Sequence, residues 1–438
     1  MTFSRAAICL CIAACSVLAQ DRLQEILERI ERLEAENRAL RRELEELRSA
    51  MPGRPADTAG ARLAERLEVQ EARTAELAQV KVQTTSRYPV ELTGMVLFNL
   101  FANGAYGAGQ YPTTAALTAG SRVAGGSFRQ SIVGLRFHGP EVAGGGKVSG
   151  LFQADFWAGS DFSLNHLFRI RTATVTSEWK RFSITAGQDK PLISLREPES
   201  LAQVGVSPLT GAGNPWLWQP QIRVEERLPM GESSGLRLQG ALFQTSESRT
   251  LVPDEYAAST APARPGYQGR FEFWKDAGEE KRIELATGFH LSSSRSAGFS
   301  IPSRIFSADW LIRPVRAFEL SGLFFNGQNI APLGALRQGF VFAGSVPRAV
   351  RTRGGYGQLS WRPNQRFTLN AFSGQQDDRN ADLLPGRIGK NLVIGGNLIF
   401  RVAPNILVSL ESANIRTQHL GAGYRKVMHY DLAVAYLF

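Results

Sequence analysis

Cysteine is almost absent from this 438-residue chain, and its three cysteines, Cys9, Cys11 and Cys15, lie close to the N-terminus. The rest of the chain therefore cannot form a disulfide or use a thiolate in catalysis. After the N-terminal segment there is also no run of about twenty apolar residues, which a membrane-spanning helix requires. These two absences exclude a disulfide scaffold and a bundle of membrane-spanning helices.

Catalytic motifs are scarce as well. The chain has five histidines, and they form no H-E-x-x-H stretch and no pair with metal-ligand spacing. We expect no catalytic residues, no metal, no other cofactor and no enzymatic activity, such as that of a lipase or protease.

The first 19 residues predict a secretory signal peptide. Arg5 precedes an apolar stretch, and small residues lead up to Ala19, which suits cleavage before Gln20. With that cleavage the mature protein has no cysteine. An alternative is that the stretch ending in Cys15 is a lipobox, which would leave Cys15 lipidated.

Residues 20–50 predict a coiled coil. Apolar residues recur at alternating spacings of three and four over about four heptads, with Glu and Arg on the flanks. A single polar residue, Asn37, lies in the seam and would fix register or strand number, although it could also be a tolerated defect. The predicted oligomerisation residues are Leu23, Ile26, Ile30, Leu33, Asn37, Leu40, Leu44 and Leu47.

Residues 51–87 predict a linker. Pro52, Gly53 and Pro55 end the first helix, and a second, shorter helix is expected from about 61 to 80. Residues 21–80 carry 11 Lys/Arg and 14 Asp/Glu, whereas the chain after residue 80 carries 38 basic and 26 acidic residues. A basic surface can bind nucleic acid, but an exported chain rarely meets any, so we expect no nucleic-acid partner. Small anions, or the phosphates of lipopolysaccharide, are the expected partners of this charge.

Residues 88–438 predict an all-β domain. Most of the chain's 43 Gly and 25 Phe residues lie in this range, and short segments alternate apolar with polar residues. Short connections such as 179–181, 313–316, 362–365 and 402–405 alternate with long ones at about 102–126, 189–218, 247–267 and 327–353. This pattern predicts a 16-stranded antiparallel transmembrane β-barrel in the bacterial outer membrane. The expected strand centres are near residues 95, 133, 153, 172, 185, 224, 240, 272, 287, 308, 322, 359, 371, 396, 409 and 432.

The C-terminal strand carries a signature of its own. Tyr430, Val434, Tyr436 and Phe438 fall on one face of the strand that ends the chain. This resembles the C-terminal signature of outer-membrane proteins that the barrel-assembly machinery reads. We therefore expect Tyr436 and Phe438 to act as the assembly signal.

Strand parity separates lipid-facing residues from lumen-facing ones. A charge facing the bilayer midplane costs roughly 2–4 kcal/mol, so the charged face of each strand is expected to point inward. In the strand around residue 172, Phe168, Ile170 and Thr172 are then expected to point outward. The expected pore-lining residues are Arg136, Arg169, Arg171, Arg223, Glu225, Arg227, Arg237 and Arg270.

Three segments between residues 165 and 225 resemble a known family. The run FRIRTATV, the run ITAGQDK and the run NPWLWQPQIR are similar to those of the DcaP-like group of trimeric porins. The matching positions are Arg169 and Arg171, Gly187 and Gln188, and Pro220, Gln221 and Arg223. The resemblance implies a homotrimer, a coiled coil ahead of a 16-stranded barrel, and diffusion of anionic solutes such as dicarboxylates. The loop between the second and third segments departs from an all-basic character, because Glu197 and Glu199 accompany Arg196.

The sequence thus predicts a porin for passive diffusion of small hydrophilic solutes that favours anions. Inward arginines would set this preference, because the guanidinium group binds carboxylates through two parallel hydrogen bonds. The arginines could instead pair with inward glutamates, as Arg223 with Glu225 or Arg282 with Glu284, and fill the lumen wall structurally. A third possibility is a structural tether, in which the coiled coil engages the cell wall and the barrel is an anchor.

Overall fold

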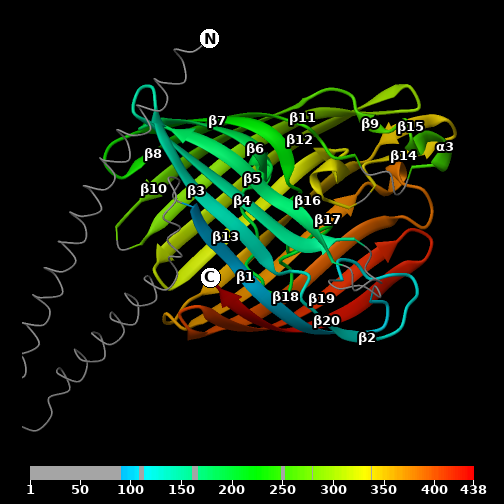
Figure 1. Ribbon diagram of the computed structural model, residues 1–438. Helices are drawn as coiled ribbons and strands as arrows, with labels where there is room; N and C mark the ends of the chain where they lie inside the picture. Colours follow the sequence, from blue (N-terminus) through cyan, green and yellow to red (C-terminus); the bar gives the residue numbers. More distant parts are fainter. Residues whose placement is uncertain (1–89, 108–112, 160–165, 248–251, 279, 337) are drawn as a thin grey trace, which may run out of the picture. The chain divides into compact units, whose positions relative to one another are not determined.

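The computed structural model describes residues 90–107, 113–159, 166–247, 252–278, 280–336 and 338–438. Within this part, sixteen antiparallel strands form a closed barrel (Figure 1). Each of the sixteen expected strand centres lies inside one of these strands. The barrel strands are β1 (Val90–Asn103), β3 (Ile132–Val142), β4 (Gly146–Ala158), β5 (Leu167–Glu178), β6 (Phe182–Asp189), β7 (Gln219–Pro229), β8 (Ser234–Phe243), β10 (Gly266–Asp276), β11 (Arg282–Ser296), β12 (Phe299–Val315), β13 (Phe318–Gln328), β16 (Arg351–Trp361), β17 (Phe367–Asp378), β18 (Ile388–Ala403), β19 (Ile406–His419) and β20 (Gly423–Leu437).

The barrel closes between its first and last strands. β1 pairs with β3 over Val90–Met95, and with β20 from Met95, opposite Leu437, to Asn103, opposite His429. The other neighbours in the barrel follow chain order, so each strand pairs with the next one along the sequence. Closure matters in a membrane because no strand edge is left with unpaired backbone groups.

Shorter elements lie in the connections between barrel strands. β2 (Val123–Ser127) pairs with β1, and β9 (Ala261–Pro262) pairs with β11. β14 (Phe340–Ala343) and β15 (Val346–Ala349) form a separate hairpin. The described helical elements are η1 (Leu192–Ser194), α3 (Asp254–Ala257), η2 (Ala331–Leu333) and η3 (Asn380–Asp382). None of the helices in the described part of the chain has the length and apolarity needed to cross a membrane.

The two ends of the barrel differ in their connections. One end, here the turn end, has only short connections, and all four predicted long connections lie at the other, the loop end. The alternation is nevertheless incomplete, because two connections at the loop end, 297–298 and 420–422, are also short. The predicted turn at 313–316 is displaced, since β12 runs on to Val315 and the connection is 316–317. In such barrels the turn end is periplasmic and the loop end extracellular.

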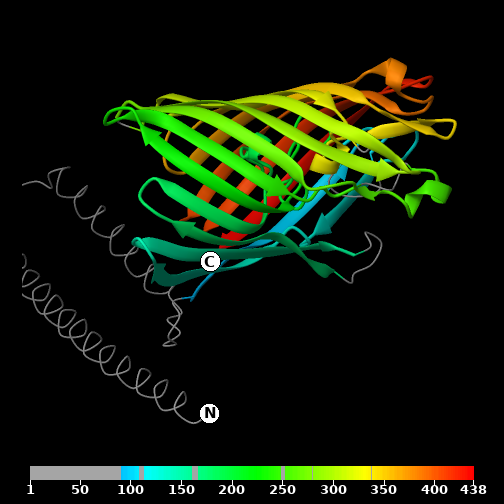
Figure 2. The same ribbon diagram turned by 90° about the horizontal axis from the view of Figure 1, so that it is seen from above.

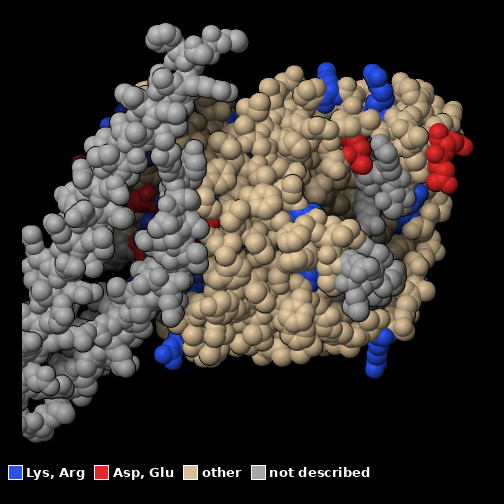
Figure 3. Space-filling view, viewed as in Figure 1, with Lys and Arg blue, Asp and Glu red and all other residues tan. Residues whose placement is uncertain are grey.

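The outer surface of the barrel is apolar. In β20, Tyr430, Val434 and Tyr436 are exposed, whereas Ala433 and Ala435 are fully buried, which confirms the alternation predicted for this strand. Figure 3 shows that the barrel side in view carries few charged side chains across its middle and both basic and acidic ones toward its edges. Phe438 packs tightly on β1, because a Cβ added to Gly94 would lie 2.5 Å from its ring.

A β-bulge in β5 corrects one expected orientation. Gln153 of β4 is opposite Thr172, but the next residue, Ala154, is opposite Ile170, so Arg171 is an extra residue. The exposed residues of β5 therefore have even numbers before the bulge, as Ile170 does, and odd numbers after it, as Val175 does. The expectation that Thr172 points outward is wrong, because the bulge moves it to the inward face.

The signal peptide, the coiled coil with its eight seam residues, and the linker fall within residues 1–89. These predictions lie outside the described residues.

Candidate functional site in the lumen

The connection between β6 and β7, residues 190–218, runs inside the barrel and is called the lumen loop here. Its backbone bonds to inward side chains on distant strands. The Leu192 amide donates to Gln268 of β10 (2.6 Å), and the Asn99 amide of β1 donates to the Leu201 carbonyl (2.9 Å). A loop that contacts both strands must cross the lumen, and Figure 2 shows loop segments within the curved wall. The sequence predicted a long connection at about 189–218, but it did not predict that this connection runs inside the barrel.

Gln130, just before β3, holds the middle of the lumen loop. This side chain is fully buried. Its Nε2 donates to the Ala202 carbonyl (2.8 Å), and its Oε1 accepts from the amides of Val204 (2.8 Å) and Gly205 (2.7 Å). One side-chain amide therefore satisfies three backbone groups that would otherwise be buried without partners.

Next to this segment is a group that we call the Asp155 cluster: Asp155, Arg169, Arg171 and Trp218. Arg169 donates two hydrogen bonds to the Asp155 carboxylate (3.1 and 2.6 Å), and Arg171 donates one (3.1 Å). Asp155 is 0% exposed, and the side chain of Arg169 is 26% exposed. Two cations therefore share one carboxylate.

Neutral groups complete the surroundings of these two arginines. Arg171 also donates to the Val204 carbonyl (2.6 Å), and Arg169 donates to the Gly205 carbonyl. Both guanidinium groups lie over the Trp218 ring, at 5.2 Å for Arg169 and 4.5 Å for Arg171. Carbonyl dipoles and an aromatic face stabilise cations without removing their charge. Glu197 of the lumen loop also interacts electrostatically with Arg171, but it pairs with Lys190 (2.6 Å). With both of these residues counted, the group still has a formal excess of one positive charge.

A second group, which we call the Arg270 cluster, joins β8, β10, β11 and β12 to the lumen loop. It consists of Arg196, Arg237, Arg270, Glu272, Glu284 and Asp309. Three arginines thus face three carboxylates, and the cluster is formally neutral.

The Arg270 cluster is a dense network of ion pairs that continues at its edges to Arg282, which pairs with Glu284, and to Glu225, which pairs with Arg237 (3.5 Å). Arg270 bonds to Asp309 through two parallel contacts (2.9 and 2.8 Å) and to Glu272 at 2.5 Å. Arg196, which comes from the lumen loop, contacts Asp309 at 3.1 Å and also pairs with Glu284. The side chains of Arg270 and Glu272 are each 1% exposed. This network fixes the loop to the wall and leaves little of its charge open to a solute.

The remaining expected pore-lining residues lie on the inward faces of their strands. Arg223 pairs with Asp189 (3.3 Å), whereas the described residues show no ion pair between Arg223 and Glu225. Arg227 bridges Glu178 and Glu225 (2.6 and 2.7 Å).

Two further ion pairs lie toward the turn end. Arg136 pairs with Glu91 (3.3 Å), and the possible pair of Arg282 with Glu284 is formed. Each arginine expected to line the pore therefore has a carboxylate partner.

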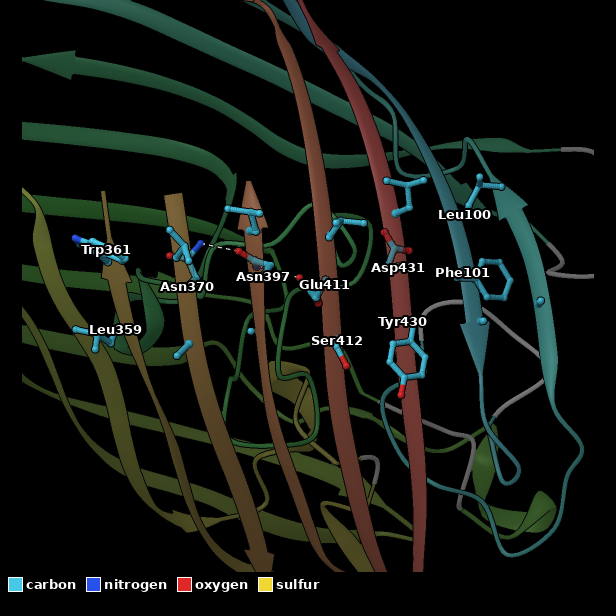
Figure 4. Close-up of a pocket in the computed structure, with 18 of the residues that line it drawn as sticks. Leu100, Phe101, Leu359, Trp361, Asn370, Asn397, Glu411, Ser412, Tyr430 and Asp431 are labelled. Atoms are coloured by element: carbon cyan, nitrogen blue, oxygen red, sulfur yellow. Dashed lines mark hydrogen bonds between the residues drawn. The ribbon is translucent and has the colours of Figure 1, made fainter. Parts of the chain in front are cut away.

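The opposite part of the lumen wall is rich in amides. Asn370 of β17 donates to Asn397 of β18 (2.8 Å), and Asn397 donates to Glu411 of β19 (3.0 Å), as Figure 4 shows. Glu411 also accepts from Ser200 of the lumen loop (2.6 Å). This wall holds the loop through neutral groups and a buried carboxylate.

Sequence reasoning missed the acidic partners of the arginines. Asp155 and Asp309 were not singled out, although each lies on the inward parity of its strand, two residues from Gln153 and from Ser307. Period-two alternation could have placed both inside. It could not show which arginine each one contacts, because that depends on the register of neighbouring strands.

The described residues offer little for catalysis. The stretch Gly231–Gly235 does fit the G-x-S-x-G pattern of serine hydrolases, but it forms the turn between β7 and β8 and not a strand–turn–helix elbow. His290 bonds to Ser292 (2.9 Å) and to Gln268 (3.0 Å), where a triad would require a carboxylate, and it is fully buried. No group of three or more potential metal ligands occurs among the described residues.

Comparisons with known proteins give a fold but no sequence family. No family model matches the chain, and no curated protein sequence is similar to it. Among solved structures, the outer membrane channel DcaP of Acinetobacter baumannii has a TM-score of 0.65 at 15% identity, covering 82% of this chain and 100% of that one. The anion-selective porin from Comamonas acidovorans has a TM-score of 0.55 at 13% identity, covering 80% and 100%. The chain thus has the closed, 16-stranded barrel fold of these outer-membrane channels, together with an apolar outer belt.

Proposed function

We propose that this protein is a passive diffusion channel for small hydrophilic solutes and that it favours anions such as dicarboxylates. The observation that carries the proposal is the Asp155 cluster. There, two arginines share one carboxylate inside a closed barrel, and Arg169 is partly exposed to the lumen. A fixed excess of positive charge in the lumen attracts anions and repels cations. One structural neighbour is described as an outer membrane channel and another as an anion-selective porin, which agrees with this class of function.

Arginine suits the proposed solute class. Its planar guanidinium group stays charged at any physiological pH and can donate two parallel hydrogen bonds to a carboxylate. Asp155 occupies only part of the donors of Arg169 and Arg171. A passing carboxylate can therefore compete for these donors without the wall having to refold.

Conductance of the purified full chain in a planar bilayer tests the proposal. We expect open-channel steps, and in a KCl gradient a reversal potential displaced toward the chloride equilibrium potential. Absence of conductance would favour the structural tether, since an anchor does not require a pore. Displacement toward the potassium potential would contradict anion preference while leaving the channel proposal intact.

We also propose that the protein is a homotrimer assisted by residues 21–49. The support is the unbroken heptad pattern of that segment. Deleting residues 21–80 should lower the temperature at which the oligomer dissociates in detergent and leave the barrel folded. An unchanged dissociation temperature would remove the segment from this role.

Tyr436 and Phe438 are proposed to be read by the barrel-assembly machinery. Tyr436 is exposed on the outer face of the last strand, and Phe438 packs over Gly94 at the closure of the barrel. Phe438→Asp should leave the protein in the periplasm, where it would be degraded. Normal outer-membrane levels of this variant would contradict the proposal.

A further inference from the structure

The outer wall has a shallow hollow across β16, β17, β18, β19, β20 and β1, called the outer hollow here. Its volume is about 1130 Å³, which exceeds the roughly 300–1,000 Å³ of ordinary small-molecule pockets. Figure 4 shows part of its lining, with Trp361 at one side and Leu100 at the other. The outward-facing residues that line it include Leu100, Ala102, Leu359, Trp361, Leu369, Ala371, Gly396, Leu398, Leu410, Ser412, Tyr430 and Leu432.

Small residues in the middle of the wall create the outer hollow. Ala371, Gly396 and Ser412 occupy neighbouring strands where other parts of the wall carry exposed rings such as Phe271 and Phe306. Gly396 is constrained, because a Cβ there would lie 2.7 Å from the Asn370 carbonyl oxygen. The hollow is therefore built into the backbone and does not depend on one movable side chain.

Basic side chains, called the basic rim here, lie on the loop-end side of the outer hollow, on the outward face of the same strands. Arg416 of β19 is directly opposite Lys426 of β20, and both are exposed. The next two outward pairs toward the turn end are Asn414 with Met428 and then Ser412 with Tyr430, which lines the hollow. Like charges directly opposite one another in a sheet are destabilising. Among the described residues neither Arg416 nor Lys426 contacts a carboxylate, so an external anion would relieve the repulsion.

The rim continues on the neighbouring strands. Asp377 of β17 is close to both Arg353 (3.2 Å) and Lys390 (3.6 Å). Four basic side chains and one carboxylate thus lie on the loop-end side of the hollow, four to six residues beyond its lining along their own strands. This end is extracellular in barrels of this kind, so the rim lies where the phosphates of outer-leaflet glycolipids are found.

We propose that the outer hollow and its basic rim bind one phosphorylated glycolipid of the outer leaflet. Its phosphate would be held between Arg416 and Lys426, and its acyl chains would occupy the hollow. This site is on the outside of the barrel and does not depend on whether the lumen conducts ions.

Charge complementarity favours a phosphate over a second copy of the chain. Outward carboxylates are scarce on the described strands, where Asp377 is already paired and Glu226 lies near the turn end. A second copy would therefore bring little negative charge to Arg416 and Lys426. A glycolipid supplies both the charge and the apolar chains.

Native mass spectrometry of the full chain in detergent tests the proposal. The probes are bis-phosphorylated lipid A and the same lipid without its phosphates. The wild-type protein should bind the phosphorylated form about tenfold more tightly. The double variant Arg416→Gln, Lys426→Gln should lose this preference, and the control Arg304→Gln, an exposed arginine on β12 away from the hollow, should keep it. Equal affinities for the two lipids, or full preference in the double variant, would overturn the proposal.

A second pair of variants tests the hollow itself. Ala371→Trp fills it and should weaken binding of both lipids, and unchanged binding would remove the hollow from the site. Ser412→Cys introduces a cysteine into a region that has none. Subunits of a trimer meet through different surfaces, so a photo-cross-linker is attached to this cysteine, and we expect no cross-linked product between copies in the membrane. A cross-linked oligomer would show that the hollow is a subunit contact and would overturn the lipid assignment.

Discussion

The Asp155 cluster and the Arg270 cluster both bring arginines into the lumen, but their surroundings give these arginines different roles. Arg270 is buried and bonded to two carboxylates in a group with equal numbers of positive and negative side chains. Arg169 is partly exposed, and the one carboxylate that it contacts among the described residues, Asp155, is shared with Arg171. The first cluster is a structural joint between wall and loop, and the second keeps charge that a solute can meet.

This difference shows that the number of inward arginines does not determine selectivity. A cation that is already neutralised at contact distance adds little field at the distance of a passing ion. Selectivity depends on the local excess of positive charge and on how far this charge is exposed to the lumen. The comparison predicts that substitutions in one cluster act on stability and in the other on ion preference.

The largest effect is expected for Arg270→Gln. The variant leaves Glu272 and Asp309 buried with fewer cationic partners, and breaking a buried ion pair in this way costs about 3–5 kcal/mol. We expect a clearly lower temperature for loss of the SDS-resistant folded barrel on heating. The matched control Arg353→Gln, whose partner Asp377 is on the outer rim, should cost less than about 1 kcal/mol. Similar losses in both variants would remove the structural distinction drawn for Arg270.

A selective effect on ion preference is expected for Arg169→Gln. Asp155 keeps Arg171 as a partner, so the barrel should stay folded, but the excess positive charge of the cluster disappears. The reversal potential in a KCl gradient should move strongly toward that of a non-selective channel. Arg237→Gln, in the Arg270 cluster, is the control and should change the reversal potential less. A larger shift in the control would reverse the assignment of the two clusters.

A shift in the opposite direction is expected for Asp155→Asn. The amide oxygen can still accept from Arg169, and both arginines keep their backbone carbonyls and the Trp218 ring. The variant should therefore lose less stability than Arg270→Gln. Its reversal potential should move further toward chloride, and an unchanged potential would show that the cluster lies away from the narrowest part of the lumen.

The smallest effect is expected at Asp382, which lies in a loop outside both clusters. Hydrogen bonds from the Arg351 guanidinium hold the pKa of Asp382 below its usual value. The pair therefore stabilises the loop above about pH 4, the usual aspartate pKa, and this contribution is lost as the pH falls through the lowered pKa. Hydrogen exchange of residues 379–387, corrected for intrinsic rates, should increase over that interval. Asp382→Asn should abolish this pH dependence, and a variant with the wild-type profile would assign it to another group.

Much of the barrel could be predicted from the sequence, because lipid on the outside enforces a period of two. Outward positions in the middle of the wall are mostly apolar, so Leu135, Val224 and Phe271 identify the faces of their strands without knowledge of any neighbour. The same rule placed the eight pore-lining candidates on inward positions. The rule failed at Thr172, because a bulge reverses which positions of β5 point outward. The residue types in the sequence do not indicate where such a bulge occurs.

The arrangement of the lumen could not be predicted in the same way. Whether Arg196 bonds to Asp309 depends on how a 29-residue loop, 190–218, folds back into the barrel, and no local pattern specifies this path. The pairing of Arg169 with Asp155 depends on register between β4 and β5, which includes two irregularities. Long-range contacts of this kind are set by the whole fold, and the sequence shows only the residue types available for them.

The seam between β1 and β20 has a consequence for the order of folding. Asn103 and His429 are opposite one another although more than 300 residues separate them along the chain. The barrel can therefore close only after the segment containing β20 has been delivered to the membrane. Until then β1 and β19 are both edge strands, and exposed edges are templates for aggregation and targets for proteases. A chaperone that occupies one of these edges during transit would shorten the period of risk, and chains cut within β20 should persist only while such a chaperone is bound.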